Sequence, residues 1–133
     1  MGTIGKFEDL LVWQKARLLC REIFQIASTG SFSRDLGLKN QIIASSGSIM
    51  DNISEGFGRG GNGEFIQFLA ISAGSTAEVK SQLYRAFDRG YIDEQKLQDF
   101  ILKVDEIKKM LGSLIRYLRQ SKLKGPKFYT RPE

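Results

Sequence analysis

Apolar residues recur at three- and four-residue steps through four long segments of this 133-residue chain. That spacing places the apolar side chains on one face of an α-helix, and only short breaks rich in Gly, Ser or Asp interrupt it. The four segments run over about residues 9–28, 35–57, 64–89 and 94–122. No stretch shows the apolar-polar alternation of a strand. The pattern therefore predicts an all-α fold, an up-down-up-down four-helix bundle.

The predicted bundle is one domain over residues 7–122, followed by a basic, poorly ordered tail at residues 123–133. A domain of this length buries roughly two-thirds of its unfolded surface, so it needs no disulfide or metal to fold. Ser33, Asn62 and Asp93 are predicted to cap the second, third and fourth helices. Gly30 and Gly90 are predicted to end the first and the third.

Two further glycines, Gly47 and Gly74, lie inside predicted helices. A glycine there costs about 1 kcal/mol relative to alanine, so each requires a compensating interaction. We expect two helix backbones to approach closely at these positions. A ligand groove is the alternative explanation.

The chain contains no histidine and a single cysteine. The missing histidine excludes His-based acid/base catalysis, Ser-His and Cys-His nucleophile pairs, and His-ligated zinc or haem. Cys20 lies on the apolar stripe of the first helix, which predicts a buried inert thiol. Asp51, Glu55, Glu64 and Glu78 are the carboxylates considered for a metal site, but capping and ion pairing explain them better. We therefore expect no enzymatic activity, no cofactor and no metal site.

The first residues lack the uninterrupted apolar stretch of a signal peptide, because Glu8 and Asp9 follow Lys6 at once. No apolar run approaches the ~20 residues that span a bilayer. Together with the lone thiol, this predicts a soluble, cytoplasmic protein without membrane contact.

The net charge of +5 is concentrated near the C-terminal end of the chain. Residues 122–133 hold four bases and one acid, whereas residues 1–121 hold 16 bases and 14 acids. Between positions 108 and 131 there are eight bases and no acid: Lys108, Lys109, Arg116, Arg119, Lys122, Lys124, Lys127 and Arg131. This asymmetry indicates a polyanionic partner such as RNA or DNA. A solubilising tail and a solvated helix face are the alternatives.

The bases of the fourth helix, from Lys108 to Lys122, fall within an arc of about 140° at 100° per residue, opposite the apolar residues. Phe128 and Tyr129 in the tail add rings of the kind that stack on unpaired bases. The sequence therefore predicts nucleic-acid binding through a basic C-terminal surface.

The first helix carries a second apolar row formed by Leu11, Leu18 and Ile26. This row makes the apolar face wider than one packing partner requires. It is compatible with an interface between copies of the chain in a homo-oligomer.

Short motifs between Phe7 and Leu118 resemble, in order, those of a known family. The motifs are Phe7-Glu8-Asp9-Leu10, Val12-Trp13-Gln14-Lys15-Ala16, Asn52-Ile53-Ser54-Glu55-Gly56-Phe57-Gly58-Arg59, Glu64-Phe65-Ile66-Gln67-Phe68-Leu69 and Gly90-Tyr91. They resemble the four-helix-bundle proteins encoded by intervening sequences of bacterial 23S rRNA genes. The same superfamily includes the accessory variability protein of diversity-generating retroelements, which works with a reverse transcriptase. The resemblance implies a homopentamer without catalytic activity and with a role in RNA or DNA binding.

The chain departs from this family at three positions that usually carry positive charge, where it has Ile43, Ala44 and Ala73. This leaves Arg59, the bases of the fourth helix and the tail as the expected nucleic-acid contacts. The alternative is an oligomeric scaffold that binds a protein partner, such as a reverse transcriptase, without touching nucleic acid.

Overall fold

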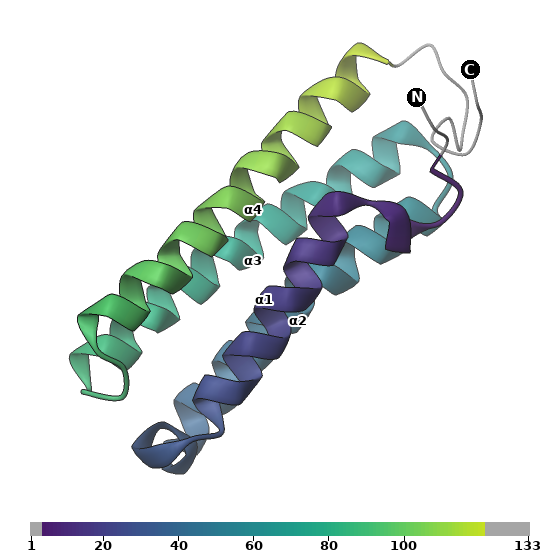
Figure 1. Ribbon diagram of the computed structural model, residues 1–133. Coiled ribbons are helices and arrows are strands. Elements are labelled where there is room, and N and C mark those ends of the chain that lie inside the picture. Colours follow the sequence, from purple (N-terminus) through teal and green to yellow (C-terminus); the bar gives the residue numbers. More distant parts are fainter. Residues whose placement is uncertain (1–3, 122–133) are drawn as a thin grey trace.

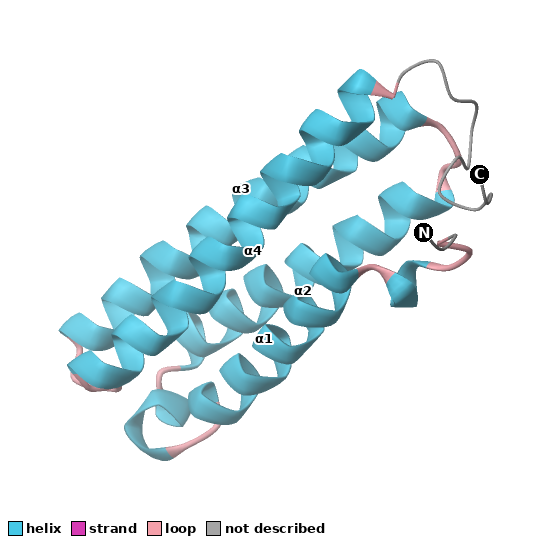
Figure 2. Ribbon diagram, turned by 45° about the horizontal axis from the view of Figure 1, so that its top comes forward, coloured by secondary structure: helices cyan, strands magenta, loops and turns pink. Residues whose placement is uncertain are grey.

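The computed structural model describes residues 4–121. These residues form four long helices, α1 (Leu11–Ala27), α2 (Leu36–Gly58), α3 (Asn62–Asp88) and α4 (Glu94–Gln120). Short 3-10 helices at Phe7–Asp9 and Gly30–Arg34 precede α1 and join it to α2. Consecutive helices run in opposite directions, so α1 begins and α4 ends at the same end of the bundle (Figure 1). Residues 4–121 contain no strand (Figure 2), which confirms the predicted all-α bundle.

The apolar face of each helix points into one shared core, as the residue spacing predicts. The clearest case is α3, where residues at alternating steps of four and three are all buried: Phe65, Leu69, Ser72, Thr76, Val79, Leu83 and Ala86. On α4 the buried set includes Leu97, Ile101, Val104, Ile107, Leu111 and Leu118. Each buried large aliphatic side chain stabilises the fold by about 1.5–3 kcal/mol relative to an exposed one. Cys20 is half-buried, with the Ser46 hydroxyl 3.9 Å from its Sγ.

Small residues allow α2 and α3 to pack closely. The Ser72 hydroxyl donates to the Ile49 carbonyl oxygen at 2.8 Å, so this buried polar group is satisfied across the two helices. Gly56 lies at a close approach, where an added Cβ would be 2.6 Å from Phe68 Cβ and 3.0 Å from Phe65 Cδ1. A side chain does not fit at Gly56 unless the helices separate.

The predicted close approach at Gly47 and Gly74 is wrong. An added Cβ would meet nothing within 4 Å at either position, apart from atoms of its own helix and chain neighbours. Gly74 lies on the exposed face of α3, and Gly47 is only half-buried on α2. Neither glycine is therefore required by packing among the described residues.

Two of the three predicted helix caps also differ from the prediction. Asp93 caps α4 as expected, since its carboxylate accepts from the Lys96 amide at 2.8 Å. The N-cap of α2 is Asp35, whose carboxylate accepts from the Leu38 amide at 3.2 Å, and not Ser33. Ser33 lies in the preceding 3-10 helix and donates to a carbonyl oxygen there.

Asn62 is the first residue of α3 and not its cap. Its side-chain amide donates to the carbonyl oxygens of Leu118 and Ser121, at 3.2 and 3.1 Å. These carbonyls belong to the last turn of α4, where intrahelical partners run out. Asn62 thus ties the connection between α2 and α3 to the end of α4.

The glycines predicted to end helices have the expected backbone conformation. Gly90 follows the C-cap of α3 with φ of 78°, and Gly30 comes two residues after the C-cap of α1 with φ of 58°. Both values lie in the left-handed region, which glycine adopts without a steric penalty.

Asp35 also joins the two loops at the other end of the bundle. Its carboxylate accepts hydrogen bonds from the Tyr91 hydroxyl and from Arg89, each at 2.7 Å. The Tyr91 hydroxyl, the Leu38 amide and Arg89 hold the pKa of Asp35 below its ordinary value. The same hydrogen bond to the Asp35 carboxylate raises the pKa of Tyr91.

Candidate nucleic-acid interface

The charged side chains of α4 are used differently in its two halves. Residues 94–106 contain both acids and bases, and three ion pairs connect this half to α1 and α3. The pairs are Lys80–Asp105 at 3.0 Å, Lys15–Glu106 at 3.4 Å and Lys103–Glu22 at 2.8 Å. Residues 107–121 contain no acid. The charges of the first half are therefore paired with neighbouring helices, and the second half carries the excess positive charge.

Four bases of the second half form what we call the basic face: Lys108, Lys109, Arg116 and Arg119. All four side chains are exposed, and none is within ion-pair distance of an acid in residues 4–121. They lie within about 100° of the helix circumference and extend over about 16 Å of its length. The hydrogen bond of Arg116 to the Ser113 hydroxyl, at 3.2 Å, leaves its charge uncompensated. The basic face therefore presents four cations to an external anion.

Arg59 lies at the end of the bundle where α4 ends and where Asn62 attaches the α2–α3 connection to α4. Its guanidinium pairs with Glu55 at 2.9 Å and lies over the Phe68 ring, 5.0 Å from the ring centre. A nearby acid thus compensates the charge of Arg59, unlike the charges of the basic face. The other predicted contacts, Lys122, Lys124, Lys127 and Arg131, lie outside the described residues.

A groove of about 340 Å³ lies between α3 and α4 and is continuous with the basic face through Lys108. Its lining comprises Thr76, Ala77, Lys80, Ser81 and Tyr84 of α3, and Val104, Asp105 and Lys108 of α4. The Tyr84 side chain remains 45% exposed. The sequence interpretation missed Tyr84, although its place beside the buried Leu83, off the apolar stripe of α3, was a signal for exposure.

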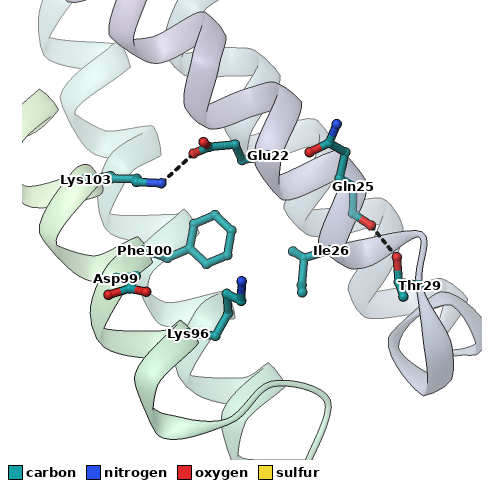
Figure 3. A pocket seen from close by; sticks show the side chains of 8 residues that line it. All are labelled: Glu22, Gln25, Ile26, Thr29, Lys96, Asp99, Phe100 and Lys103. Atoms are coloured by element: carbon teal, nitrogen blue, oxygen red, sulfur yellow. Dashed lines mark hydrogen bonds and ion pairs between the residues drawn. The ribbon is translucent and has the colours of Figure 1, made fainter.

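A second hollow, also about 340 Å³, opens between α1 and α4 (Figure 3). Ile26 of α1 and Phe100 of α4 project into it from opposite sides. Its charged lining is balanced, with Lys96 and Lys103 against Glu22 and Asp99. Because it carries no excess charge, this hollow is not an extension of the basic face.

The apolar row on α1 is divided by the fold. Leu11 and Leu18 are 57% and 46% exposed, whereas Ile26 is half-buried and packs against the core. Phe24, next to the fully buried Ile23, is exposed as well. The outer face of α1 therefore exposes Leu11 and Leu18 to solvent, whereas Ile26 is partly covered by the core.

Two of the three positions where the resemblance leads us to expect positive charge are not free surface. Ile43 and Ala73 are half-buried and pack against the core, and only Ala44 is exposed. In this chain, α2 and α3 use two of these positions for packing.

The carboxylates considered for a metal site do not assemble one. Within residues 4–121, no three His, Cys, Asp or Glu side chains are grouped to hold a metal ion. The same residues include no helix with the length and apolar character needed to cross a membrane.

Comparison with known proteins places this geometry in context. The family model described as 23S rRNA-intervening sequence protein matches residues 8–113. A solved structure of a protein with unknown function, from the S23 ribosomal protein family of Bacteroides thetaiotaomicron, superposes with a TM-score of 0.73. That match has 23% sequence identity and covers 80% of this chain and 99% of the other, and at this identity the likeness shows the fold alone. No curated protein matches the chain.

Proposed function

This chain belongs to the 23S rRNA-intervening sequence protein family, and we propose that it is a non-enzymatic, cytoplasmic homo-oligomer that binds RNA or DNA. The binding surface is the basic face of α4. The observation that carries the proposal is the set of four exposed cations without an acidic partner in residues 4–121. Lys and Arg clustered along one helix face are the electrostatic footprint of a phosphate-binding surface.

The proposal includes the homopentamer that the family resemblance implies. Repetition of the basic face on every subunit places several such surfaces on one particle, which multiplies contacts to a long polyanion. Light scattering that gives five times the monomer mass supports this assembly, and a monomer contradicts it.

Phosphate binding has a measurable salt dependence. Each phosphate that a base neutralises releases condensed counterions, so log K falls with log[salt] by about 0.9 per contact for a duplex and about 0.7 for a single strand. Four contacts predict a loss of about 50- to 150-fold in affinity between 50 and 200 mM salt. If bases of residues 122–133 bring the number to six or more, the loss reaches several hundred-fold.

The test is fluorescence anisotropy with a labelled RNA hairpin over this salt range. In the variant, all four bases of the basic face become glutamine: Lys108→Gln, Lys109→Gln, Arg116→Gln and Arg119→Gln. The control removes the same charge from exposed positions elsewhere: Arg17→Gln, Arg21→Gln, Arg34→Gln and Lys96→Gln.

The variant is expected to reduce the magnitude of the salt slope by about 3, and the control by less than 1. Absence of wild-type binding at 50 mM salt contradicts the proposal. Equal losses in the variant and the control also contradict it, because they show that net charge and not the basic face determines binding.

A second candidate function is an oligomeric scaffold that binds a protein partner, such as a reverse transcriptase, without contacting nucleic acid. The exposed Leu11 and Leu18 favour it, because they offer an apolar surface at helical spacing. A partner that stays bound after nuclease treatment and is lost in Leu11→Gln/Leu18→Gln supports the scaffold, provided that the variant keeps the wild-type mass.

A further inference from the structure

We propose that the groove between α3 and α4 holds an unpaired base of a single-stranded nucleic acid, stacked on the ring of Tyr84. This inference rests on the proposed function and names its ligand more narrowly. It follows from the ring, the space beside it and the distribution of charge along the groove.

Tyr84 supplies a flat aromatic surface that the rest of the described chain covers only in part. Its side chain is 45% exposed in the groove lining, and its hydroxyl makes no hydrogen bond to residues 4–121. Stacking of a base on an exposed ring removes apolar surface of both partners from water, and it tolerates any base because every base has a π-face.

The neighbouring side chains leave room for a base. Ala77 and Ser81 precede Tyr84 by about two turns and one turn, respectively, on the same exposed face of α3, and both are small. The resulting volume of about 340 Å³ is at the lower end of the range for small-molecule sites, which suits a single base.

Along the groove, a neutral ion pair separates the ring of Tyr84 from the first unpaired basic residue, Lys108. In the middle, Lys80 is neutralised by both carboxylate oxygens of Asp105, at 3.0 and 3.3 Å. Because α3 and α4 are antiparallel, Tyr84 and Lys108 lie on opposite sides of this ion pair, about 10 Å apart along the bundle axis. Lys108 has no acidic partner in residues 4–121 and begins the basic face. A strand with a base on Tyr84 therefore continues along a row of cations, the combination typical of single-strand binding surfaces.

A duplex does not use this groove in the same way. Its bases are paired and stacked inside the helix, so no base reaches Tyr84 without the cost of unstacking, a few kcal/mol. The basic face binds phosphates of either form, but the ring discriminates in favour of a single strand.

The experiment compares a 20-nucleotide oligouridine RNA with a 20-base-pair RNA duplex by anisotropy at 50 mM salt. Tyr84→Ala is expected to weaken binding of the single strand by about 5- to 150-fold and binding of the duplex by less than twofold. Tyr84→Phe keeps the ring and is expected to retain the wild-type affinity. Ile71→Ala, at a 53% exposed position outside the groove lining, is the matched control and is expected to change neither affinity.

The salt slope separates the ring from the cations. Tyr84→Ala is expected to leave the slope unchanged because no phosphate contact is lost, whereas Lys108→Gln lowers its magnitude by about 0.7. Equal effects of Tyr84→Ala on both probes overturn the inference. So does a change in particle mass, which shows that the groove is a contact between copies of the chain.

Failure of this inference is distinguishable from failure of the proposed function. If Tyr84→Ala binds the single strand normally while the fourfold glutamine variant does not, the groove is not part of the binding surface. The proposal that the basic face binds nucleic acid then still stands. If the wild type binds neither probe, both proposals fail.

Discussion

Replacement of Gly56 by alanine is expected to destabilise the protein, whereas the same replacement at Gly74 is expected to stabilise it. Both glycines lie within long helices, so alanine improves helix propensity at both by up to about 1 kcal/mol. The difference arises from the surroundings of the added methyl group.

At Gly56 the new Cβ would lie 2.6 Å from Phe68 Cβ, about 1 Å closer than an ordinary carbon-carbon contact. Neither atom moves away by side-chain rotation, because a Cβ is fixed by its backbone. Helices α2 and α3 must therefore separate locally, at a cost near the upper end of the 1–3 kcal/mol typical of overpacking. After the gain in propensity, the net loss is about 1–2 kcal/mol.

At Gly74 an added Cβ meets nothing within 4 Å outside its own helix and chain neighbours. Only the gain of about 0.5–1 kcal/mol remains, since alanine also reduces the entropy of the unfolded chain. The two variants should therefore differ by about 1.5–3 kcal/mol in the free energy of unfolding.

Urea unfolding followed by circular dichroism, at one fixed protein concentration, measures this difference. Fixed concentration matters because the stability of an oligomer depends on it. Gly47→Ala serves as a second control, since its added Cβ is also free of contacts within 4 Å. A Gly56→Ala protein as stable as the wild type refutes the close approach of α2 and α3.

Three further substitutions test the packing and the connections. Asp35→Asn removes a carboxylate that stabilises the folded protein. This contribution is complete above the ordinary pKa of 3.8 and is lost as the pH falls through the lower pKa of the folded state. The melting temperature of the variant should therefore be lower than that of the wild type at pH 7, and the two should converge toward about pH 2. Asn62→Ala removes two hydrogen bonds to the last turn of α4 and should cost about 1 kcal/mol in urea unfolding, with faster amide exchange at Ser121. Leu118→Ala leaves a cavity at a fully buried position and should cost about 2–5 kcal/mol; a loss below 1 kcal/mol contradicts the burial.

The helices and their core faces follow from the sequence because one period governs each long segment. The cap of α4, Asp93, also follows, but those of α2 and α3 do not, since Ser33, Asp35 and Asn62 are all good cap residues by type. Which of them begins a helix depends on the backbone path of the connection before it, as in the 3-10 helix Gly30–Arg34, which includes Ser33. Asn62 serves instead as a link to α4, an interaction between positions far apart in sequence.

The surroundings of two glycines follow from their place relative to the buried stripes of their helices. Gly56 continues the buried stripe of Ile49 and Ile53 at four- and three-residue steps, so its position on the packed face was predictable. Gly74 lies off the stripe of α3 that contains Ser72 and Thr76, which also indicated exposure.

The basic face was predictable from the run of bases without acids, but the pairing of other charges was only partly so. The Arg59–Glu55 pair has the four-residue spacing of helical ion pairs and lies within reach of sequence reasoning. The pairs between α4 and its neighbours require the three-dimensional arrangement. The groove beside Tyr84 also depends on how α3 and α4 pack.

The division of α4 into a paired half and an unpaired half separates the charges that contact neighbouring helices from charges that the fold does not use. Arg116 and Arg119 are like charges three residues apart, an arrangement that disfavours a helix by about 0.2–0.5 kcal/mol. Their neutral replacements should therefore be tolerated or even stabilising, and only ligand affinity opposes them. Single charges of the basic face can therefore be lost or moved while the fold persists.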